Sequence, residues 1–336
     1  MKRVTDINKL SELVNITERG GIVLGGQVVC DGFYEDAILH IITHAHSDHI
    51  RGLRNSIMYA HYIAATPATM EILEALGYRI PRHKRLPLDY GKPIRIEDTQ
   101  VTLYPSRHII GSAQVEVKVK NYTLAYTGDF KLPGTSILHP DVLVIEATYG
   151  HPKTVRPFKD EVETLFTDLV MEGLSKGPVA VFGYHGKLQE AMEILRSADL
   201  DVPFIAPERV YKIAMIAEKY GMKLSPIYRD GSRDAREALR NNWYVYFHHI
   251  SGWRRRSVDG YNIILSGWEF EEPIRRLDNN VYLVALSDHA DFDDLLTYVK
   301  ESKPKLVVID GYRSSWPQTL AREIKQRLNV EAIVMP

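Results

Sequence analysis

The sequence predicts an α/β protein built in two parts, and three features of the chain support this. Residues 1–150 are rich in predicted strands joined by short turns, with few helices. After Gly150, helical and strand-like segments alternate, which is typical of a parallel sheet covered by helices. From Val281 onward the pattern continues as strand, helix, strand, helix and strand.

The elements of the first part follow from apolar or alternating runs bounded by turn residues. These runs predict strands at residues 21–30, 37–42, 57–63, 101–104, 114–119, 122–126 and 142–145. One helix is predicted over residues 67–77, because Pro67 suits a first helical turn and Gly77 suits a helix end.

The elements of the second part begin with a helix over residues 158–174, whose apolar residues recur at helical spacing until Gly177 and Pro178 end it. Strands are predicted next at 179–182, 202–206, 243–247 and 262–265, and helices at 188–196 and 208–220. The final stretch predicts strands at 281–286, 306–309 and 332–335, and helices at 292–300 and 317–328.

The composition is that of a folded protein. The chain has 336 residues, of which 45% are hydrophobic and 25% charged, and its formal net charge is −1. The single cysteine, Cys30, argues against a disulfide framework and a cysteine-based zinc site, so we expect a reducing, cytoplasmic location. We expect no signal segment and no membrane partner, because no apolar run approaches membrane-spanning length. With no global positive charge, any contact with a polyanion depends on local basic patches and metal ions.

Six consecutive residues, His44-Ala45-His46-Ser47-Asp48-His49, form the strongest functional signal. They follow the predicted strand at 37–42, so this strand delivers three imidazoles and a carboxylate into the next turn. Both groups are ligands that zinc accepts. Along an extended path His44 and His46 point to one side, whereas Asp48 and His49 can turn toward a second metal about 3.5–4 Å away. The alternative interpretation is a histidine-rich polar loop.

Further ligands are expected where other strands end. His108 follows the run at 101–104, and Asp129 follows the run at 122–126, where its two oxygens can bridge two cations. Asp31 follows the run at 21–30 and suits an orienting role toward a ligand or a metal-bound water. Taken singly, His108 is also a plausible loop residue and the two aspartates are also turn formers. Together with residues 44–49 they predict a metal centre.

These residues, in this order, resemble the metallo-β-lactamase superfamily of zinc hydrolases, and further motifs resemble its β-CASP nucleases. The motifs are Ile-Glu-Ala-Thr-Tyr-Gly at 145–150, Gly-Lys-Leu-Gln-Glu at 186–190, Leu-Ser-Gly-Trp at 265–268 and Ser-Asp-His-Ala-Asp at 287–291. Together they span essentially the whole chain and resemble ligase-associated exonucleases and messenger-RNA end-processing factors in particular.

The resemblance implies a specific architecture. A metallo-β-lactamase αββα sandwich would be formed by residues 1–150 plus 283–336. A β-CASP α/β domain with a Rossmann-like parallel sheet would be inserted at residues 151–282, and the active site would lie between the two domains.

The resemblance also implies two divalent metal ions, with zinc as the first expectation. The first ion would be held by His44, His46, His108 and Asp129. The second would be held by Asp48, His49 and the shared Asp129. A pair of such ions lowers the pKa of water and neutralises the charge of a phosphodiester.

Two further residues take catalytic roles by the same resemblance. His289 would protonate the leaving 3′ oxygen, and Glu146 would buttress that histidine. Asp48 and Asp31 complete the expected catalytic set, the first at the metals and the second behind them.

One position departs from the RNA-cleaving members, which carry a histidine ligand of the second metal after the strand that follows His289. Here Asp310 takes that place. A carboxylate can bind zinc, but aspartate is shorter than histidine, which would leave the second site weaker or open to manganese. The alternative is that Asp310 is a turn residue before Gly311.

Strand contacts are expected from basic residues in the inserted domain. Arg254, Arg255 and Arg256 lie beside Trp253 and can bind backbone phosphates next to a stacked base. Lys187, at a predicted helix start, can meet a phosphate together with the helix N-terminus. The alternative for the arginines is a solvated loop.

The leading hypothesis is therefore a zinc-dependent nuclease acting exonucleolytically on single strands, with DNA slightly favoured over RNA. Partners would be single-stranded DNA or RNA and proteins of DNA repair or RNA processing. The first alternative is an RNA-processing ribonuclease of the same family. Another is a catalytically silent nucleic-acid-binding subunit, although every ligand position through Asp129 is filled. A small-ester hydrolase is disfavoured by the β-CASP motifs of residues 145–290.

Overall fold

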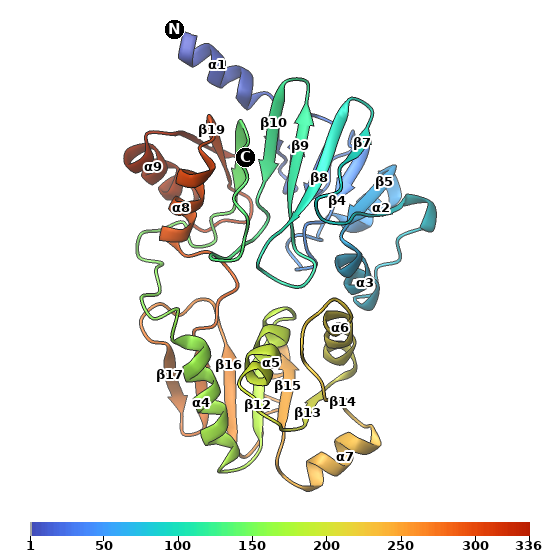
Figure 1. The fold of residues 1–336 in the computed structure, drawn as a ribbon, viewed down its shortest axis with the longest axis vertical. Coiled ribbons are helices and arrows are strands. Elements are labelled where there is room, and N and C mark those ends of the chain that lie inside the picture. Colours follow the sequence, from blue (N-terminus) through green and yellow to red (C-terminus); the bar gives the residue numbers. More distant parts are fainter. Residues whose placement is uncertain (1) are drawn as a thin grey trace. The chain divides into compact units, whose positions relative to one another are not determined.

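The computed structural model describes residues 2–336, and contact between segments divides them into two compact units. The first unit runs to Val155 and resumes at His289 for the C-terminal part of the chain, and the second covers Arg156–Asp288. Each unit has its own sheets and helices, as the colours of Figure 1 show.

The first unit begins with a six-stranded sheet in the order β1-β2-β3-β4-β5-β6. Pairing is antiparallel from β1 to β3 and parallel from β3 to β6. The strands are β1 (Val14–Ile16), β2 (Gly21–Leu24), β3 (Val28–Asp31), β4 (Leu39–Ile41), β5 (Tyr62–Ala65) and β6 (Arg85–Pro87). Associated helices are α1 (Lys2–Ser11), α2 (Leu53–Tyr59), α3 (Pro67–Ala75) and the 3-10 turn η1 (Arg82–Lys84).

A seven-stranded sheet completes the first unit, in the order β20-β19-β11-β10-β9-β8-β7. The pairs from β20 to β10 are parallel and those from β10 to β7 antiparallel. Its strands are β7 (Ile94–Ile96), β8 (Thr99–Pro105), β9 (Ala113–Val119), β10 (Tyr122–Tyr126), β11 (Val142–Ile145), β19 (Leu306–Asp310) and β20 (Glu331–Met335).

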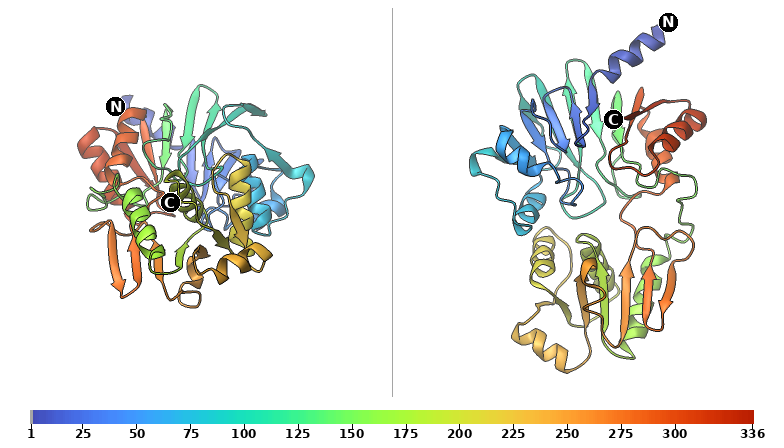
Figure 2. Two further views of the ribbon diagram at one scale, coloured as in Figure 1. Left: turned by 60° about the horizontal axis from the view of Figure 1, so that its bottom comes forward. Right: turned by 180° about the vertical axis from the view of Figure 1, so that it is seen from behind.

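The core of the first unit lies between its two sheets. Side chains of β2, β3 and β4, such as Leu24 and Ile41, pack there against β9, β10 and β11 residues such as Val117 and Val144. The other face of the seven-stranded sheet packs on α8 (Phe292–Ser302) and α9 (Pro317–Leu328), which lie side by side in Figure 1 and, in red, in Figure 2. Because β-strands alternate their side chains between faces, β10, β11 and β19 supply both of these cores. The predicted fold class is confirmed.

Two predicted strands of the first unit are wrong. The run at 21–30 forms two strands, β2 and β3, which pair antiparallel across a turn. Residues 57–63 were expected to be extended, but the chain forms α2 through Tyr59 and begins β5 only at Tyr62. The helix buries Leu53 and Ser56, three residues apart, and leaves Met58 66% exposed. The apolar run therefore crosses a helix end and a strand start, and its continuity does not indicate one element.

The second unit is one seven-stranded sheet in the order β14-β13-β15-β12-β16-β18-β17. All its pairs are parallel except β17 with β18. The strands are β12 (Val179–Gly183), β13 (Phe204–Ala206), β14 (Ile227–Arg229), β15 (Val245–His249), β16 (Tyr261–Leu265), β17 (Ile274–Asp278) and β18 (Val281–Val284). The central strand β12 is a completely buried apolar run, as expected where helices cover both faces of a sheet.

The helices of the second unit are α4 (Val162–Leu174), α5 (Lys187–Ser197), α6 (Glu208–Lys219), α7 (Arg233–Arg240) and the 3-10 turn η2 (Ile250–Gly252). Of these, α7 has no counterpart in the sequence prediction. It packs Ala235 and Ala238 against Ile205 and Tyr246 of the sheet. Across residues 2–336, no helix combines the length and the apolar character that a bilayer crossing would require.

Candidate metal centre

The predicted ligands converge at one edge of the two sheets of the first unit. His44, His46 and His49 lie on the loop after β4, His108 follows β8, and Asp129 follows β10. The turn before Asp129 needs glycine, because Gly128 has a φ of 56° and a Cβ there would lie 3.0 Å from the carbonyl oxygen of Ala113. Strands that end at one edge thus bring residues 85 positions apart into contact.

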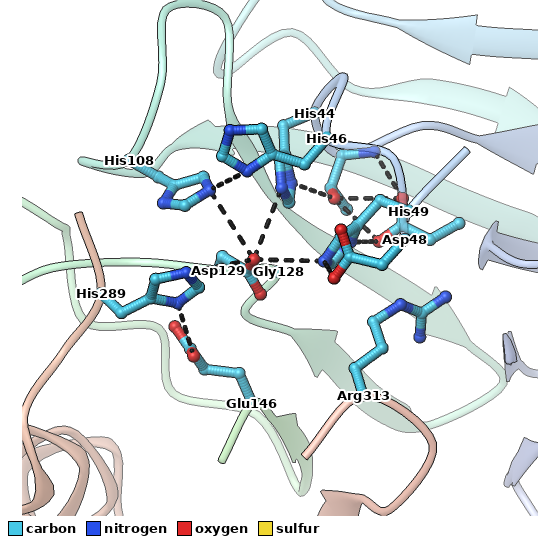
Figure 3. A network of polar contacts seen from close by, with 12 residues as sticks. His44, His46, Asp48, His49, His108, Gly128, Asp129, Glu146, His289 and Arg313 are labelled. Atoms are coloured by element: carbon cyan, nitrogen blue, oxygen red, sulfur yellow. Dashed lines mark hydrogen bonds and ion pairs between the residues drawn. The ribbon is translucent and has the colours of Figure 1, made fainter. Parts of the chain in front are cut away.

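Four of these side chains form a compact cluster. One ligand atom from each of His44, His46, His108 and Asp129 lies within 4.8 Å of the others. Nε2 of His108 is 2.9 Å from Nδ1 of His46, and Nε2 of His44 is 3.4 Å from Oδ2 of Asp129. Figure 3 shows the four groups facing a common centre. Three imidazoles and one carboxylate are a donor set that zinc accepts.

A second group of donors lies on the other side of the same carboxylate. Nε2 of His49 is 3.1 Å from Oδ2 of Asp129 and 3.6 Å from Oδ2 of Asp48. The Asp48 side chain is 44% exposed, whereas the His49 side chain is buried. Asp129 therefore lies between both groups, as a bridging ligand must.

Two buried histidine nitrogens show whether the site suits bound cations. Nε2 of His44 and Nε2 of His49 both face the carboxylate of Asp129, at 3.4 Å and 3.1 Å, but neither forms a well-directed hydrogen bond with a described residue. A buried polar atom without a partner is costly, and a bound cation would remove that cost. Burial lowers the pKa of His44 well below its usual value, and His49 and His108 lower it further, so its imidazole is neutral. The donor set and the two buried nitrogens that face Asp129 fit divalent cations.

Electrostatics point the same way at Asp129. Its burial alone would raise the pKa of the carboxyl, but the imidazoles of His49 and His289 outweigh this and hold the pKa well below its usual range. Asp129 is thus ionised. For His49, burial opposes protonation, but the carboxylates of Asp129 and Asp31 raise its pKa well above the usual value. The pocket attracts positive charge strongly, which a metal ion would supply.

Asp31 positions His49 from behind. Its Oδ2 lies 2.7 Å from Nδ1 of His49, and its carboxylate accepts hydrogen bonds from the backbone and hydroxyl of Thr43. A proton on Nδ1 of His49 faces Asp31, so a cation that replaces the proton on Nε2 would meet the lone pair of that nitrogen on the metal side. Asp31 is fully buried with a φ of 63°, a left-handed conformation that this contact geometry requires. Thr43 was not predicted from the sequence, although it directly precedes His44.

His289 and Glu146 lie beside the first cluster. Nδ1 of His289 is 3.0 Å from Oε2 of Glu146, while Oε1 of Glu146 accepts from the backbone N–H of Phe130 at 2.8 Å. Nε2 of His289 is 3.9 Å from Oδ2 of Asp129. Burial raises the pKa of Glu146 above its usual value. The imidazole is thus held at one nitrogen and directed to the cluster with the other (Figure 3).

Asp310 is held differently from the expected ligand. Its Oδ2 accepts from Nη1 of Arg313 at 2.9 Å, and its Oδ1 accepts from the backbone N–H groups of Tyr312 and Arg313. Both oxygens are therefore engaged within the chain. Ligation of a cation by Asp310 therefore stays a prediction, and a cation would have to compete with Arg313 for this carboxylate. A role for Arg313 was not predicted from the sequence. The sequence pattern that could have indicated this ion pair is an arginine three residues after the aspartate that ends a predicted buried strand.

Lys187 also differs from its prediction as a phosphate contact. It is the first residue of α5, but its Nζ donates to Oδ1 of Asp288 at 2.8 Å, and both side chains are buried. A lysine with 8% of its side chain exposed and a carboxylate partner is a structural ion pair. The phosphate contact of Lys187 stays a prediction, and it would have to compete with this ion pair.

Arg254, Arg255 and Arg256 lie in the exposed turn that follows η2 in the second unit. The guanidinium of Arg254 lies 5.7 Å from the centre of the Trp253 ring. Among the described residues none of the three forms an ion pair with a carboxylate. The structure thus leaves three cations facing solvent beside an aromatic ring.

Comparison with known proteins identifies relatives of this chain. No family model matches the chain. An "Uncharacterized protein in lig 3′ region" of Acidianus ambivalens is 47% identical over 138 residues, covering 40% of this chain and 99% of that one. A probable DNA ligase of Opitutus terrae is 29% identical over 83% of this chain and 27% of its own length. The RNase aCSPSF2 of Saccharolobus solfataricus is 26% identical over 87% of this chain and 72% of its own.

The chain covers very different shares of the lengths of these relatives. It spans about a quarter of the DNA ligase and about a third of the transcription termination factors FttA, of which that of Methanococcus maripaludis is 30% identical over 53% of this chain. Among solved structures, a protein of unknown function from Enterococcus faecalis V583 shares the fold, with a TM-score of 0.61 at 15% identity over 91% of this chain and 81% of that one.

Proposed function

The chain belongs to the β-CASP family of the metallo-β-lactamase superfamily, and from this membership we propose that it is a metal-dependent nuclease hydrolysing phosphodiester bonds of single-stranded nucleic acid. The observation that carries the proposal is the cluster of His44, His46, His108 and Asp129, with its ligand atoms within 4.8 Å of one another. The names of the relatives, a ribonuclease, a DNA ligase and transcription termination factors, point to nucleic acid as the substrate class.

The proposed chemistry divides between bound cations and the protein. The first site would be formed by His44, His46, His108 and Asp129, and the second by Asp48, His49 and Asp129. Bound there, divalent cations such as zinc would activate water and neutralise phosphodiester charge.

The protein itself would supply the proton. Nδ1–H of His289 donates a hydrogen bond to Glu146, which holds the ring in one orientation. With the ring protonated at both nitrogens, Nε2 would donate its proton to the 3′ oxygen as the P–O3′ bond breaks, which leaves a neutral imidazole with its proton on Nδ1. Such positioned groups accelerate the step about 10²–10⁴-fold. Asp31 holds the proton of His49 on Nδ1, so that Nε2 of the same ring would be available to the second cation.

Contacts with the strand are proposed for the second unit. Arg254, Arg255 and Arg256 would bind phosphates, since they are exposed cations beside Trp253. Exposed aromatic rings also follow adjacent strands: Tyr184, 56% exposed, comes after β12, and Trp268, 55% exposed, comes after β16. Since β12 and β16 pair in parallel, both rings lie at the carboxyl edge of the sheet, where they would stack with bases.

The nature of the strand and the mode of attack are finer parts of the proposal. We favour DNA, because two relatives are named for a DNA ligase or its gene region. We favour exonucleolytic digestion of single strands. The second candidate is an RNA-processing ribonuclease, which the 87% coverage by RNase aCSPSF2 favours.

One set of digestions tests these parts separately. Linear and circular oligonucleotides of one sequence, as DNA and as RNA, are incubated with the protein and with zinc, manganese or magnesium. We expect the linear DNA to be shortened stepwise and the circle to remain intact, because an exonuclease needs an end.

The control is Asp129→Asn, which removes the shared ligand and should abolish cleavage. Cleavage of circles would overturn the exonucleolytic mode, and cleavage of RNA alone would overturn the preference for DNA. Intact polymers of all four kinds, with metal shown to be bound, would identify a silent nucleic-acid-binding subunit and overturn the enzyme.

A further inference from the structure

The second metal site is poorer in protein ligands than the first. The first cluster offers three imidazoles and a carboxylate, whereas the second offers His49, the exposed Asp48 and a carboxylate already shared with the first. Asp310 is an acidic residue whose place in the sheet would suit a further ligand for the second site. It ends β19, whose register with β11 pairs Ile309 with Ile145, so Asp310 and Glu146 are each the next residue after this last pair, at the same edge of the sheet.

Asp310 is restrained by a closed set of contacts. Its side chain is 1% exposed and that of Arg313 is 6% exposed, with 2.9 Å between Oδ2 and Nη1. Its other oxygen, Oδ1, accepts from the backbone N–H of Tyr312 at 3.0 Å. The guanidinium charge at Oδ2 repels an approaching cation, so the Asp310 carboxylate binds a cation only weakly while this ion pair is closed.

Arg313 is itself fixed at a second point. Its Nη2 donates to the carbonyl oxygen of Gly20 at 2.7 Å, which ties it to the turn between β1 and β2. Gly20 has a φ of 72°, and any Cβ there would collide with the ring of Tyr312. Figure 3 shows Arg313 on the side of the site that holds Asp48 and His49. The guanidinium is therefore a buried, immobile positive charge on the second-metal side.

We propose that the Arg313–Asp310 ion pair withholds the Asp310 carboxylate from the second metal, so that the protein binds one ion tightly and a second one weakly and exchangeably. This inference rests on the proposed metal centre. Its physical basis is competition for one carboxylate: the guanidinium already satisfies Asp310, and a cation would have to displace it. Without the guanidinium, Asp310 would be a buried, unpaired anion, for which a nearby metal ion is the natural partner.

Metal titration of the full chain tests the proposal without any activity assay. Protein freed of metal is titrated with zinc and with manganese by calorimetry, and the metal content after dialysis is counted by mass spectrometry. For the unaltered protein we expect two events whose dissociation constants differ by at least tenfold. In Arg313→Met, which removes the charge but keeps a long side chain, we expect the second event to tighten on the order of tenfold, the scale on which residues behind a ligand act.

Two further variants identify the residue responsible. Arg313→Lys keeps a cation beside Asp310, so its second event should match that of the unaltered protein. Arg313→Met combined with Asp310→Asn removes the released ligand and should return the second event to its weak value. Circular dichroism of each variant shows that the fold persists, and the double variant, which buries no unpaired charge, is the one expected to fold best.

The outcomes separate this inference from the proposed function. Two equally tight events in the unaltered protein, or an unchanged second event in Arg313→Met, would overturn the inference while leaving the first ion and the nuclease in place. A second event that stays tight in the double variant would also overturn it, since Asp310 could not then be the ligand. Failure to bind even one ion would instead overturn the proposed function.

Discussion

Glu146 holds His289 by one ring nitrogen, with 3.0 Å between Oε2 and Nδ1, and is itself held by the backbone N–H of Phe130. The two residues are 143 positions apart in the chain and come from the ends of different segments of the first unit. This pairing decides which nitrogen of His289 is directed at Asp129, and hence which one can exchange a proton with a substrate.

Replacing His289 with alanine should therefore lower kcat by about 10²–10⁴-fold while leaving bound metal unchanged. Turnover of an end-labelled oligonucleotide and metal content are measured on the same preparation. The matched control is His61→Ala, an exposed histidine of the same unit, which should retain full turnover. Full turnover in His289→Ala would remove the proton-donor assignment.

Asp31→Asn should weaken the second ion by about 10–100-fold, because the amide no longer holds Nδ1 of His49 with a negative charge. Asparagine is the suitable replacement, since it tolerates the left-handed backbone at this position. Competition with a chromogenic chelator measures both affinities. Asp36→Asn, an exposed aspartate nearby, should leave both unchanged. Equal loss of both ions would mean that Asp31 supports the loop as a whole and not His49 in particular.

His40 should make the metal-free protein less stable in mild acid. Burial lowers the pKa of His40 to about 4, against an ordinary value of 6.5, so it stays neutral in the folded protein. The unfolded chain takes up the proton first as pH falls, and stability is lost between about pH 6.5 and 4, by about 3 kcal/mol at most.

Urea unfolding at pH 7 and pH 4 measures this loss. Comparison with His40→Gln isolates it from the other histidines, because they titrate equally in both proteins. The variant should lose less stability between the two pH values, and an identical loss in both proteins would refute the assignment.

The triple change of Arg254, Arg255 and Arg256 to alanine should flatten the salt dependence of strand binding. Each lost phosphate contact lowers the slope of log affinity against log salt by about 0.7 for a single strand, so a change of about 2 is expected. Fluorescence anisotropy with a labelled, uncleavable oligonucleotide gives the slope. The control removes Arg233, Arg236 and Arg240 of α7, which changes the charge equally. Equal effects of the two triple variants would indicate nonspecific attraction only.

Lys187→Met should destabilise the protein by up to about 3–5 kcal/mol, because it removes the buried ion pair between Lys187 and Asp288. Chemical unfolding monitored by circular dichroism measures the loss. The salt slope of strand binding should not change. A lower slope with normal stability would support the phosphate contact that the sequence predicted for this lysine.

The local sequence already predicted much of this protein, because strand ends and ligand types are readable without coordinates. The run 44–49 after an apolar strand, His108 and Asp129 after two others, and the change to helix–strand alternation after Gly150 all follow from short-range patterns. The structure brings the ligands together because parallel strands share an edge. By contrast, the continuous apolar run at 57–63 was predicted as one strand, although α2 ends within it and β5 begins within it. An apolar run alone does not show whether it belongs to one element or to two.

What only the tertiary structure decided is which partner each polar side chain takes. Asp310 and Lys187 have residue types and local positions that suit a ligand and a phosphate contact, yet each is engaged by a buried opposite charge, Arg313 and Asp288. Asp31 holds His49, and Glu146 holds His289, across separations that no local pattern records. Pairing between buried charges depends on distance and desolvation in the folded chain, and these arise only when segments distant in sequence have packed.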